Sequence, residues 1–301
     1  MPLYGKGVGM RHMAKRSGLA ALALMLAMPA TSPAQTPPPA QVTSSTDVIY
    51  ATHPTGPLHL DLHRPAGKGR APVLVVLHGG GWARGERPKS WTGLRPFVEA
   101  GYAIVSVQYR LSGTAQAPAA VQDARCAMAW VARNADRHQL DPRRLVVLGT
   151  SAGGHLALMA GMLGGRADID LPACGPVPRA AAIIDFYGPT DLRPESLGKW
   201  RSPSVTKWIG EGPDAPALAE RMSPLTLVRK GQVPVFIVHG DADNVVPIQS
   251  SRQLKAALDR AGVPSELHIV PGGGHGKFGE EAQARLYADA LRFLERHRIT
   301  R

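Results

Sequence analysis

The sequence has little cysteine and no apolar run long enough to cross a membrane. Its longest unbroken apolar run, residues 19–28, is too short for a helix that spans a hydrocarbon core of about 30 Å. Three histidines, His53, His59 and His63, lie in two expected strands without a matching carboxylate or cysteine set. We therefore expect neither a stable membrane anchor nor a metal site.

Acidic residues are absent before Asp47, although Lys6, Arg11, Lys15 and Arg16 lie in that stretch. The formal charge of the chain is +12, and removal of these four cations alone lowers it to +8. The remaining basic residues are spread along the chain, without a basic run that carries interleaved aromatic residues and without finger-type spacing. This pattern is typical of a solvated basic surface and argues against a nucleic-acid binding protein.

The N-terminal segment has the features of a signal peptide. Its basic residues precede the apolar run 19–28, and the small residues Ser32 and Ala34 suit cleavage after Ala34. No cysteine lies near that position, so a lipid-anchored form is not expected. We predict a signal peptide over 1–34 and export to the periplasm or the extracellular space. The translation start is open among three methionines: Met1, Met10 and Met13.

Two cysteines remain in the exported chain, Cys126 and Cys174. An oxidising compartment permits a disulfide between them. Cys126 lies in an expected helix. The alanine and valine residues of that helix form one apolar face, and Cys126 lies on the other face, so we expect its side chain to be exposed. An exposed thiol favours pairing, whereas a large separation in the fold would leave both cysteines free. The sequence leaves both possibilities open.

The rest of the chain alternates between short apolar runs and helical stretches. Residues 35–46 are rich in Pro, Ser, Thr and Gln and predict a disordered linker, followed by one domain over 47–301. Apolar runs without alternation are typical of strands that are buried on both faces of a parallel sheet. Together with a leading antiparallel pair over 47–64, they predict an α/β fold with a mostly parallel, eight-stranded, doubly wound sheet. The expected strands are 73–77, 103–107, 145–148, 181–184, 233–238 and 266–270, and the expected helices are 90–100, 117–137, 151–164, 248–262 and 279–297.

One stretch interrupts this alternation. Residues 189–223 contain five prolines and two tryptophans and show no clean period. They lie between two expected strands, so they predict a small cap over the edge of the sheet.

A G-x-S-x-G motif at residues 149–153 carries the central chemical signal. It follows the expected strand 145–148 and begins the expected helix 151–164, which is the strand–turn–helix that a nucleophile elbow requires. The glycines permit a turn too tight for larger side chains, and the strained turn exposes the hydroxyl of Ser151. Ser151 is therefore the candidate nucleophile.

A second glycine-rich motif, His-Gly-Gly-Gly-Trp at residues 78–82, directly follows the expected strand 73–77. Its backbone N–H groups have no side chains around them and can point at a developing oxyanion. Gly80 and Gly81, together with the N–H of Ala152, are the candidate oxyanion hole. A phosphate-binding loop needs a lysine and a serine or threonine after its glycines, and neither follows here.

A serine nucleophile needs a base and an acid that orients the base. His275 follows the expected strand 266–270 in a glycine-rich loop and is the candidate base. Asp241 and Asp243 both follow the strand 233–238 and are the candidates for the acid. Residues 239–247 resemble the family pattern His-Gly-x-x-Asp-x-x-Val-Pro of α/β-hydrolases, which implies that Asp243 is the acid. His155 and His239 are expected to be structural.

Residues 47–298 resemble the small secreted esterases of the α/β-hydrolase superfamily, near the acetyl xylan and feruloyl esterase branch and its acetylesterase relatives. Beyond the three candidate residues, this resemblance rests on Val-Gln-Tyr-Arg-Leu at 107–111, Asp-Phe-Tyr-Gly at 185–188 and Pro-Thr-Asp-Leu at 189–192. It implies the α/β-hydrolase fold and cofactor-free hydrolysis of short-chain or aryl esters, either small molecules or acetyl and hydroxycinnamoyl groups on plant polysaccharides.

The short N-terminal segment before residue 78 separates the chain from the hormone-sensitive-lipase branch and favours a shallow site. Trp82, Tyr187 and Trp200 are the candidate side chains to line it, and core packing is the alternative for each. A peptidase or amidase and an arylformamidase of the same fold remain alternatives, as does a catalytically inactive binding protein. The sequence does not predict the oligomeric state.

Overall fold

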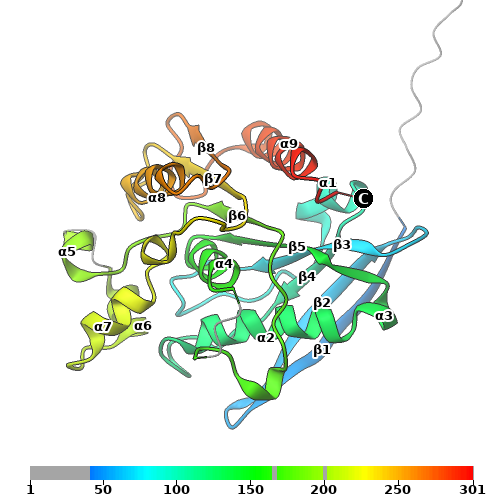
Figure 1. Cartoon of the computed structure of the whole chain (residues 1–301), viewed down its shortest axis with the longest axis horizontal. Helices are drawn as coiled ribbons and strands as arrows, with labels where there is room; N and C mark the ends of the chain where they lie inside the picture. Colours follow the sequence, from blue (N-terminus) through cyan, green and yellow to red (C-terminus); the bar gives the residue numbers. More distant parts are fainter. Residues whose placement is uncertain (1–40, 165–167, 199–201, 301) are drawn as a thin grey trace, which may run out of the picture. The chain divides into compact units, whose positions relative to one another are not determined.

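The computed structural model describes residues 41–164, 168–198 and 202–300 (Figure 1). The description concerns the second of two units of the chain, residues 40–301. The signal peptide predicted over 1–34 lies outside the described residues. None of the helices within the described ranges combines the length and the apolar character needed to cross a bilayer.

An eight-stranded sheet forms the centre of the second unit, in the order β1-β2-β4-β3-β5-β6-β7-β8. The strand β2 pairs antiparallel with both β1 and β4, and every later pairing is parallel. The predicted fold, a mostly parallel eight-stranded sheet, is confirmed. The strands are β1 (Val42–His53), β2 (Gly56–Pro65), β3 (Ala71–Leu77), β4 (Ala103–Val107), β5 (Leu140–Thr150), β6 (Ala182–Phe186), β7 (Val235–Gly240) and β8 (Ser265–Val270).

The predicted disordered linker over 35–46 is wrong at its C-terminal end. Strand β1 begins at Val42, and Val42 pairs with Pro65 of β2. The hydroxyl of Ser44 also lies 2.8 Å from Nδ1 of His63, within hydrogen-bonding distance. Polar composition suggested a solvated segment, but threonine and serine also fit an exposed strand whose backbone is satisfied by an antiparallel neighbour. Residues 35–40 lie outside the described residues.

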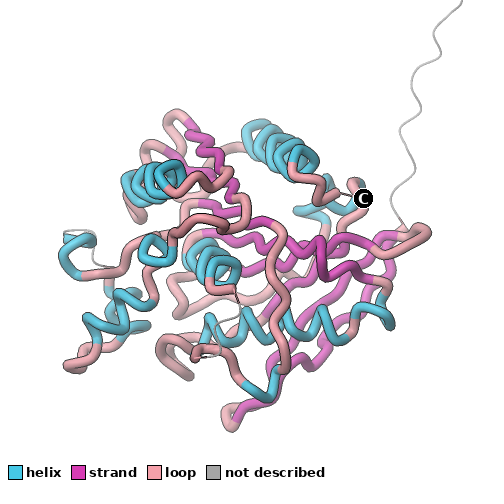
Figure 2. Tube along the Cα trace, in the orientation of Figure 1, coloured by secondary structure: helices cyan, strands magenta, loops and turns pink. Residues whose placement is uncertain are grey.

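Helices cover both faces of the sheet, as Figure 2 shows. One buried cluster joins α2, α4 and α8 to alternate strand residues such as Val73 and Val75, and a second joins α1 and α9 to the residues between them, such as Leu74 and Val76. Coverage of both faces is why a central strand such as β3 is apolar throughout rather than alternating. The helices are α1 (Arg95–Glu99), α2 (Ala119–Arg133), α3 (Ala135–His138), α4 (Ala152–Met162), α5 (Pro194–Leu197), α6 (Pro203–Ile209), α7 (Ala215–Arg221), α8 (Gln249–Arg260) and α9 (Glu280–Arg296).

A cap connects β6 to β7 and contains the short helices α5, α6 and α7 (Figure 1). Helix α6 begins after Ser202, whose hydroxyl accepts a hydrogen bond from the N–H of Val205, and the glycine at 210 ends it. Residues of α5 and α6 line the same cavity as the residues that follow β3, β5 and β6. The cap therefore faces the carboxyl ends of the central strands.

Cys126 of α2 forms a disulfide with Cys174, with the two Cα atoms 5.2 Å apart. The expectation that Cys126 is exposed is wrong, since its relative accessibility is 1%. Helix α2 contacts β1 and the short 3-10 helix Pro172–Cys174 as well as the sheet and α4. Other segments of the protein thus cover the face of α2 that carries Cys126, which the periodicity had assigned to solvent.

Candidate active site

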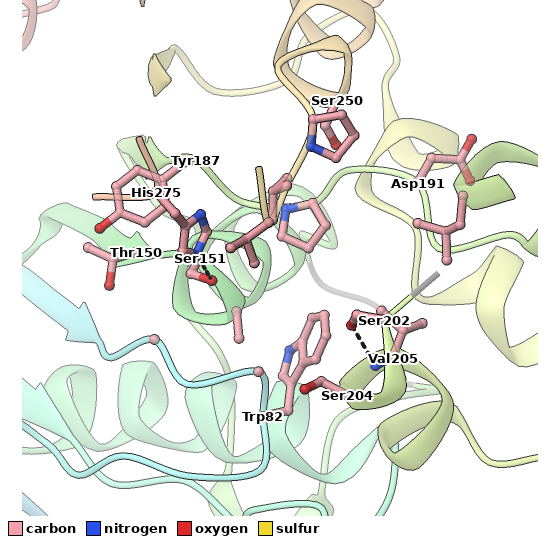
Figure 3. A pocket seen from close by; sticks show the side chains of 18 of the residues that line it. Trp82, Thr150, Ser151, Tyr187, Asp191, Ser202, Ser204, Val205, Ser250 and His275 are labelled. Atoms are coloured by element: carbon pink, nitrogen blue, oxygen red, sulfur yellow. Dashed lines mark hydrogen bonds between the residues drawn. The ribbon is translucent and has the colours of Figure 1, made fainter. Parts of the chain in front are cut away.

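A cavity of about 590 Å³ opens at the carboxyl ends of the parallel strands (Figure 3). Segments that follow β3, β5, β6, β7 and β8 contribute to its wall, together with the cap. In parallel α/β sheets this edge is where ligands bind. Both Ser151 and His275 line the cavity.

Ser151 occupies a sharp turn between β5 and α4. Its φ of 55° and ψ of −121° are uncommon for a residue other than glycine, and its N–H donates to the carbonyl of Phe186 at 2.8 Å. A Cβ at Gly149 would lie 2.0 Å from the carbonyl oxygen of Gly153, and one at Gly153 would lie 2.1 Å from that of Leu77. Only glycine fits at either position, which explains the spacing of the motif.

The hydroxyl of Ser151 is hydrogen bonded to an imidazole from the loop after β8. Its Oγ lies 2.8 Å from Nε2 of His275, and Nδ1 of His275 lies 2.7 Å from Oδ2 of Asp243 (Figure 3 draws the first contact). Since Asp243 can only accept when ionised, Nδ1 carries the proton and Nε2 is free to accept from the serine. The three side chains selected from the sequence therefore form one hydrogen-bonded series.

Asp243 is held as a carboxylate by several donors. Burial raises its pKa, but hydrogen bonds from His239, from His275 and from two backbone N–H groups together bring the pKa well below the usual value. The backbone donors are Val246 and Val245, both to Oδ1, at 2.9 and 2.8 Å. The acid is thus ionised and oriented at neutral pH.

Asp241, the other aspartate considered, lies in a different environment. It is exposed, and its Oδ1 accepts a hydrogen bond from the N–H of Gly272 at 2.6 Å. This contact joins the loop after β7 to the loop after β8, and it makes Asp241 a structural residue of the turn.

The glycine-rich loop after β3 lies against the elbow. A Cβ at Gly79 would be 3.0 Å from the carbonyl oxygen of Thr150, and Gly80 and Gly81 have φ values of 119° and 59°. Among the described residues, no protein group accepts a hydrogen bond from the N–H of Gly80, Gly81 or Ala152. Ala152 is the first residue of α4, where backbone N–H groups lack partners within the helix.

A known family model matches the part of the chain that contains the elbow. The family model named BD-FAE matches residues 60–258, about two thirds of the chain, which includes Ser151 and Asp243 but ends before His275. The chain belongs to the BD-FAE family. Its fold is the α/β-hydrolase fold, as its structural neighbours also indicate.

Several relatives and structural neighbours of this BD-FAE domain carry esterase names. It is 31% identical to the esterase LipQ of Mycobacterium tuberculosis, over 74% of this chain and 54% of LipQ. A truncated carbohydrate esterase from gut microbiota superposes with a TM-score of 0.72 at 27% identity, over 87% of this chain and 98% of that chain. An acetyl ester-xyloside bifunctional hydrolase from Caldicellulosiruptor lactoaceticus has a TM-score of 0.67 at 26% identity, over 80% and 90%. The chain spans about half the length of the curated relatives it matches.

The three side chains expected to line the BD-FAE site have different surroundings. Trp82 lines the cavity but is 2% exposed, and it stacks on Trp208 of the cap with ring centroids 4.6 Å apart. Tyr187 is half-buried in the cavity wall, with its ring centroid 4.8 Å from that of His275. Trp200 lies outside the described residues.

Both histidines assigned to structure in the sequence are fully buried. His155 donates from Nε2 to the carbonyl of Met222 at 2.7 Å, and burial lowers its pKa to about 4. His239 donates from Nε2 to the carbonyl of Val246 at 2.9 Å and accepts at Nδ1 from the hydroxyl of Ser251 at 2.7 Å. Nε2 of His239 also lies 3.4 Å from the carboxylate of Asp243. A purely structural interpretation of His239 therefore missed a contact with the candidate acid.

Asp185 is a second buried carboxyl beneath the elbow of the BD-FAE domain. Its Oδ1 accepts from the N–H of Gly188 at 2.9 Å, and a Cβ at Gly154 would lie 2.3 Å from the same oxygen. Burial raises the pKa of Asp185 to about 7, although His239 and the Gly188 N–H act in the opposite direction. Its position within the Asp-Phe-Tyr-Gly phrase was visible in the sequence, but a carboxyl at a strand end gives no sign of burial.

Within the described ranges, no group of three or more histidine, cysteine, aspartate or glutamate side chains is placed to hold a metal ion. The chemistry available to the site is that of a hydroxyl, an imidazole and a carboxylate in series, next to free backbone donors.

Proposed function

We propose that the protein is a secreted serine carboxylic-ester hydrolase that forms an acyl-enzyme on Ser151. The observation that carries this proposal is the series of hydrogen bonds from Ser151 through His275 to Asp243 at the wall of an open cavity. The esterase names of its relatives support the same chemistry. Short-chain or aryl esters are the proposed substrates, in particular acetyl or feruloyl groups on plant polysaccharides.

In the first half-reaction, Nε2 of His275 takes the proton of Ser151 as Oγ attacks the ester carbonyl carbon. The carbonyl π-bond becomes an oxyanion, for which the N–H groups of Gly80, Gly81 and Ala152 are the proposed donors. His275, now an imidazolium stabilised by Asp243, then protonates the alcohol oxygen. The C–O bond breaks, and the acyl group remains on Ser151.

In the second half-reaction, water replaces the alcohol. His275 removes a proton from the water, the hydroxide attacks the acyl carbon, and the same donors bind the second oxyanion. Proton transfer back to Oγ of Ser151 releases the carboxylic acid and restores the starting state. No step requires a cofactor.

The cavity wall offers an ester substrate both hydrogen-bonding and apolar surface. Hydroxyl and amide side chains from the cap and from α8 line it together with apolar side chains from the cap and from the loop after β7. These are Ser196, Ser202, Ser204, Gln249 and Gln253, with Leu197, Val245 and Pro247. The similarity to an acetyl ester-xyloside bifunctional hydrolase favours acetylated xylan among the candidate polysaccharides.

Export is part of the proposal. The N-terminal pattern of basic residues, apolar run and small residues supports cleavage after Ala34, and the Cys126–Cys174 disulfide is compatible with an oxidising compartment. We expect the mature protein recovered from the producing cells to lack residues 1–34. Intact mass measurement of that protein checks this, and retention of residues 1–34 would reject it.

The direct test of the activity uses the fluorophosphonate reaction and a set of substrates. Wild-type protein should be labelled at Ser151, and Ser151→Ala and His275→Ala should lose both the labelling and ester hydrolysis. Acetyl, butyryl, octanoyl and feruloyl esters and acetylated xylan identify the acyl group. Hydrolysis of peptide anilides or formylated arylamines in preference to these esters would favour the peptidase or arylformamidase alternative, and unlabelled wild-type protein would favour the inactive binding protein.

A further inference from the structure

The backbone of Tyr187 is hydrogen bonded and has an uncommon conformation. It directly follows β6, and its N–H donates to the carbonyl of Val238 in the neighbouring strand β7 at 2.7 Å. Its φ of 45° lies in the left-handed region, which a bulky residue rarely adopts. A backbone conformation of this kind persists only where the surroundings impose it, and such residues gather at functional sites.

The side chain of Tyr187 contacts the loop that carries His275 at two points. The two rings meet edge to face at 63°, with centroids 4.8 Å apart, and Figure 3 shows them side by side above Ser151 and Thr150. The hydroxyl of Tyr187 lies where a side chain at Gly276 would begin, since a Cβ there would be 2.5 Å from that oxygen.

Thr150, the residue before the nucleophile, also interacts with this side chain, since it acts to lower the pKa of the Tyr187 phenol. Burial nevertheless raises that pKa to about 12, so the phenol is neutral over the working range of an esterase. The ring of Phe278, two residues after Gly276, also meets Tyr187 edge to face at 5.6 Å.

The loop that carries His275 needs such support. His275 is preceded by three glycines and followed by Gly276, and glycine loses the most conformational freedom on ordering. Hydrogen bonding to Asp243 fixes Nδ1 of the imidazole but leaves the ring free to tilt about that contact. A displacement of about 1 Å at a reacting group lowers a rate by about a hundredfold.

We propose that Tyr187 is a positioning residue for His275, which it holds in line between Ser151 and Asp243 through its ring and through the contact of its hydroxyl with Gly276. The inference rests on the proposed function, because it assigns Tyr187 to the orientation of the base rather than to substrate binding.

The first experiment compares Tyr187→Phe, Tyr187→Leu and the control Tyr287→Leu on nitrophenyl acetate. Tyr287 of α9 is also half-buried and packs against Phe186 and Phe97, and among the described residues its ring makes no contact with the ring of His275. We expect Tyr187→Phe to stay within about threefold of wild type and Tyr187→Leu to lose about 10- to 100-fold in kcat with KM within about twofold. Tyr287→Leu should keep kcat. The low-field proton resonance of His275 Nδ1–H should broaden or vanish only in Tyr187→Leu.

An increase in KM with unchanged kcat for Tyr187→Leu would overturn the proposal, because the tyrosine would then be a wall of the substrate site. Equal losses of kcat in Tyr187→Leu and Tyr287→Leu would also overturn it. Failure of the proposed function has a different signature, since Ser151→Ala and His275→Ala would then remain active. If these two variants are inactive and Tyr187→Leu is unimpaired, only the inference about Tyr187 fails.

A second experiment holds even if Tyr187→Leu does not fold. Gly276→Ala places a Cβ against the Tyr187 hydroxyl, and Tyr187→Phe removes that oxygen. The cost of a positive φ at residue 276, which is 68°, is the same in both backgrounds and cancels. The fold-loss in kcat that Gly276→Ala causes should be about threefold smaller, or smaller still, in the Tyr187→Phe background than in wild type. Additive losses would reject the coupling.

Discussion

Replacement of Asp243 by asparagine should remove nearly all turnover while leaving the fold intact. The N–H groups of Val245 and Val246 both donate to Oδ1 of Asp243, so an asparagine is held with its carbonyl oxygen at that position. Its NH₂ group then faces Nδ1 of His275. Nδ1 must accept, the proton moves to Nε2, and the imidazole can no longer accept the proton of Ser151.

The size of this effect follows from the loss of the base. In the serine protease triad, the same aspartate-to-asparagine change lowers kcat about 10⁴-fold through the wrong tautomer, which is about 5 kcal/mol of transition-state stabilisation. We expect a similar loss here, because the two backbone donors to Oδ1 leave the asparagine no productive orientation. Initial rates on nitrophenyl acetate, normalised by the fraction of folded protein, measure it.

Asp241→Asn is the matched control. Its Oδ1 accepts from the N–H of Gly272, and an asparagine oxygen accepts the same bond, so turnover should stay within about threefold of wild type. If Asp243→Asn keeps more than a tenth of the wild-type rate, or if Asp241→Asn is the more damaging change, the tautomer argument and the choice of acid are both refuted.

Three further predictions follow from buried or crowded positions. Because the folded pKa of Asp185 is raised to about 7, the stability due to its protonated form is complete below about pH 4 and is lost as the pH rises through 7. Between pH 4 and pH 8 the wild-type protein should therefore lose unfolding free energy on the order of 4 kcal/mol through Asp185, and Asp185→Asn should lack this loss. Denaturant unfolding at a series of pH values measures it, and an equal loss in both proteins would contradict the prediction. Replacement of Cys126 and Cys174 by alanine opens a loop of 48 residues and should cost about 4 kcal/mol in the same assay, whereas two free thiols in the unreduced protein would contradict the disulfide. Gly80→Ala places a Cβ 1.9 Å from the carbonyl oxygen of Arg84 at a φ of 119°, so kcat should fall about a hundredfold, and an unchanged kcat would exclude this loop from the oxyanion hole.

Local sequence patterns predicted the sheet well because the burial of each central strand is visible in its own run of apolar residues. The runs Val73–Leu77 and Val235–Val238 are apolar throughout since helices cover both faces, and the glycine at 149 marks a turn that admits no side chain. Asp243 was distinguished from Asp241 by the resemblance of its turn to a family pattern, and the hydrogen bonds that Asp243 accepts from Val245 and Val246 show what that turn provides.

Errors arose where long-range packing determines the outcome. Polarity predicted a linker over 35–46, but β2 supplies a partner for residues 42–45. Periodicity predicted an exposed Cys126, which the segment around Cys174 helps to cover. The contact of Tyr187 with Gly276 joins residues 89 positions apart and depends on the placement of two loops. No local pattern contains that information.

The cap is inserted between two strands that pair directly with each other, β6 and β7. Loop closure costs only about 0.6 kcal/mol for each doubling of length, so this connection tolerates exchange for longer or shorter segments. Exchange has structural conditions. Trp208 of the present cap stacks on Trp82, Ser204 abuts Gly81, and the carbonyl of Met222 accepts a hydrogen bond from His155 of α4, so a grafted segment must reproduce these contacts if the loop after β3 and the elbow are to keep their shape. With these contacts kept, the substrate range of this scaffold can be engineered separately from its reaction chemistry.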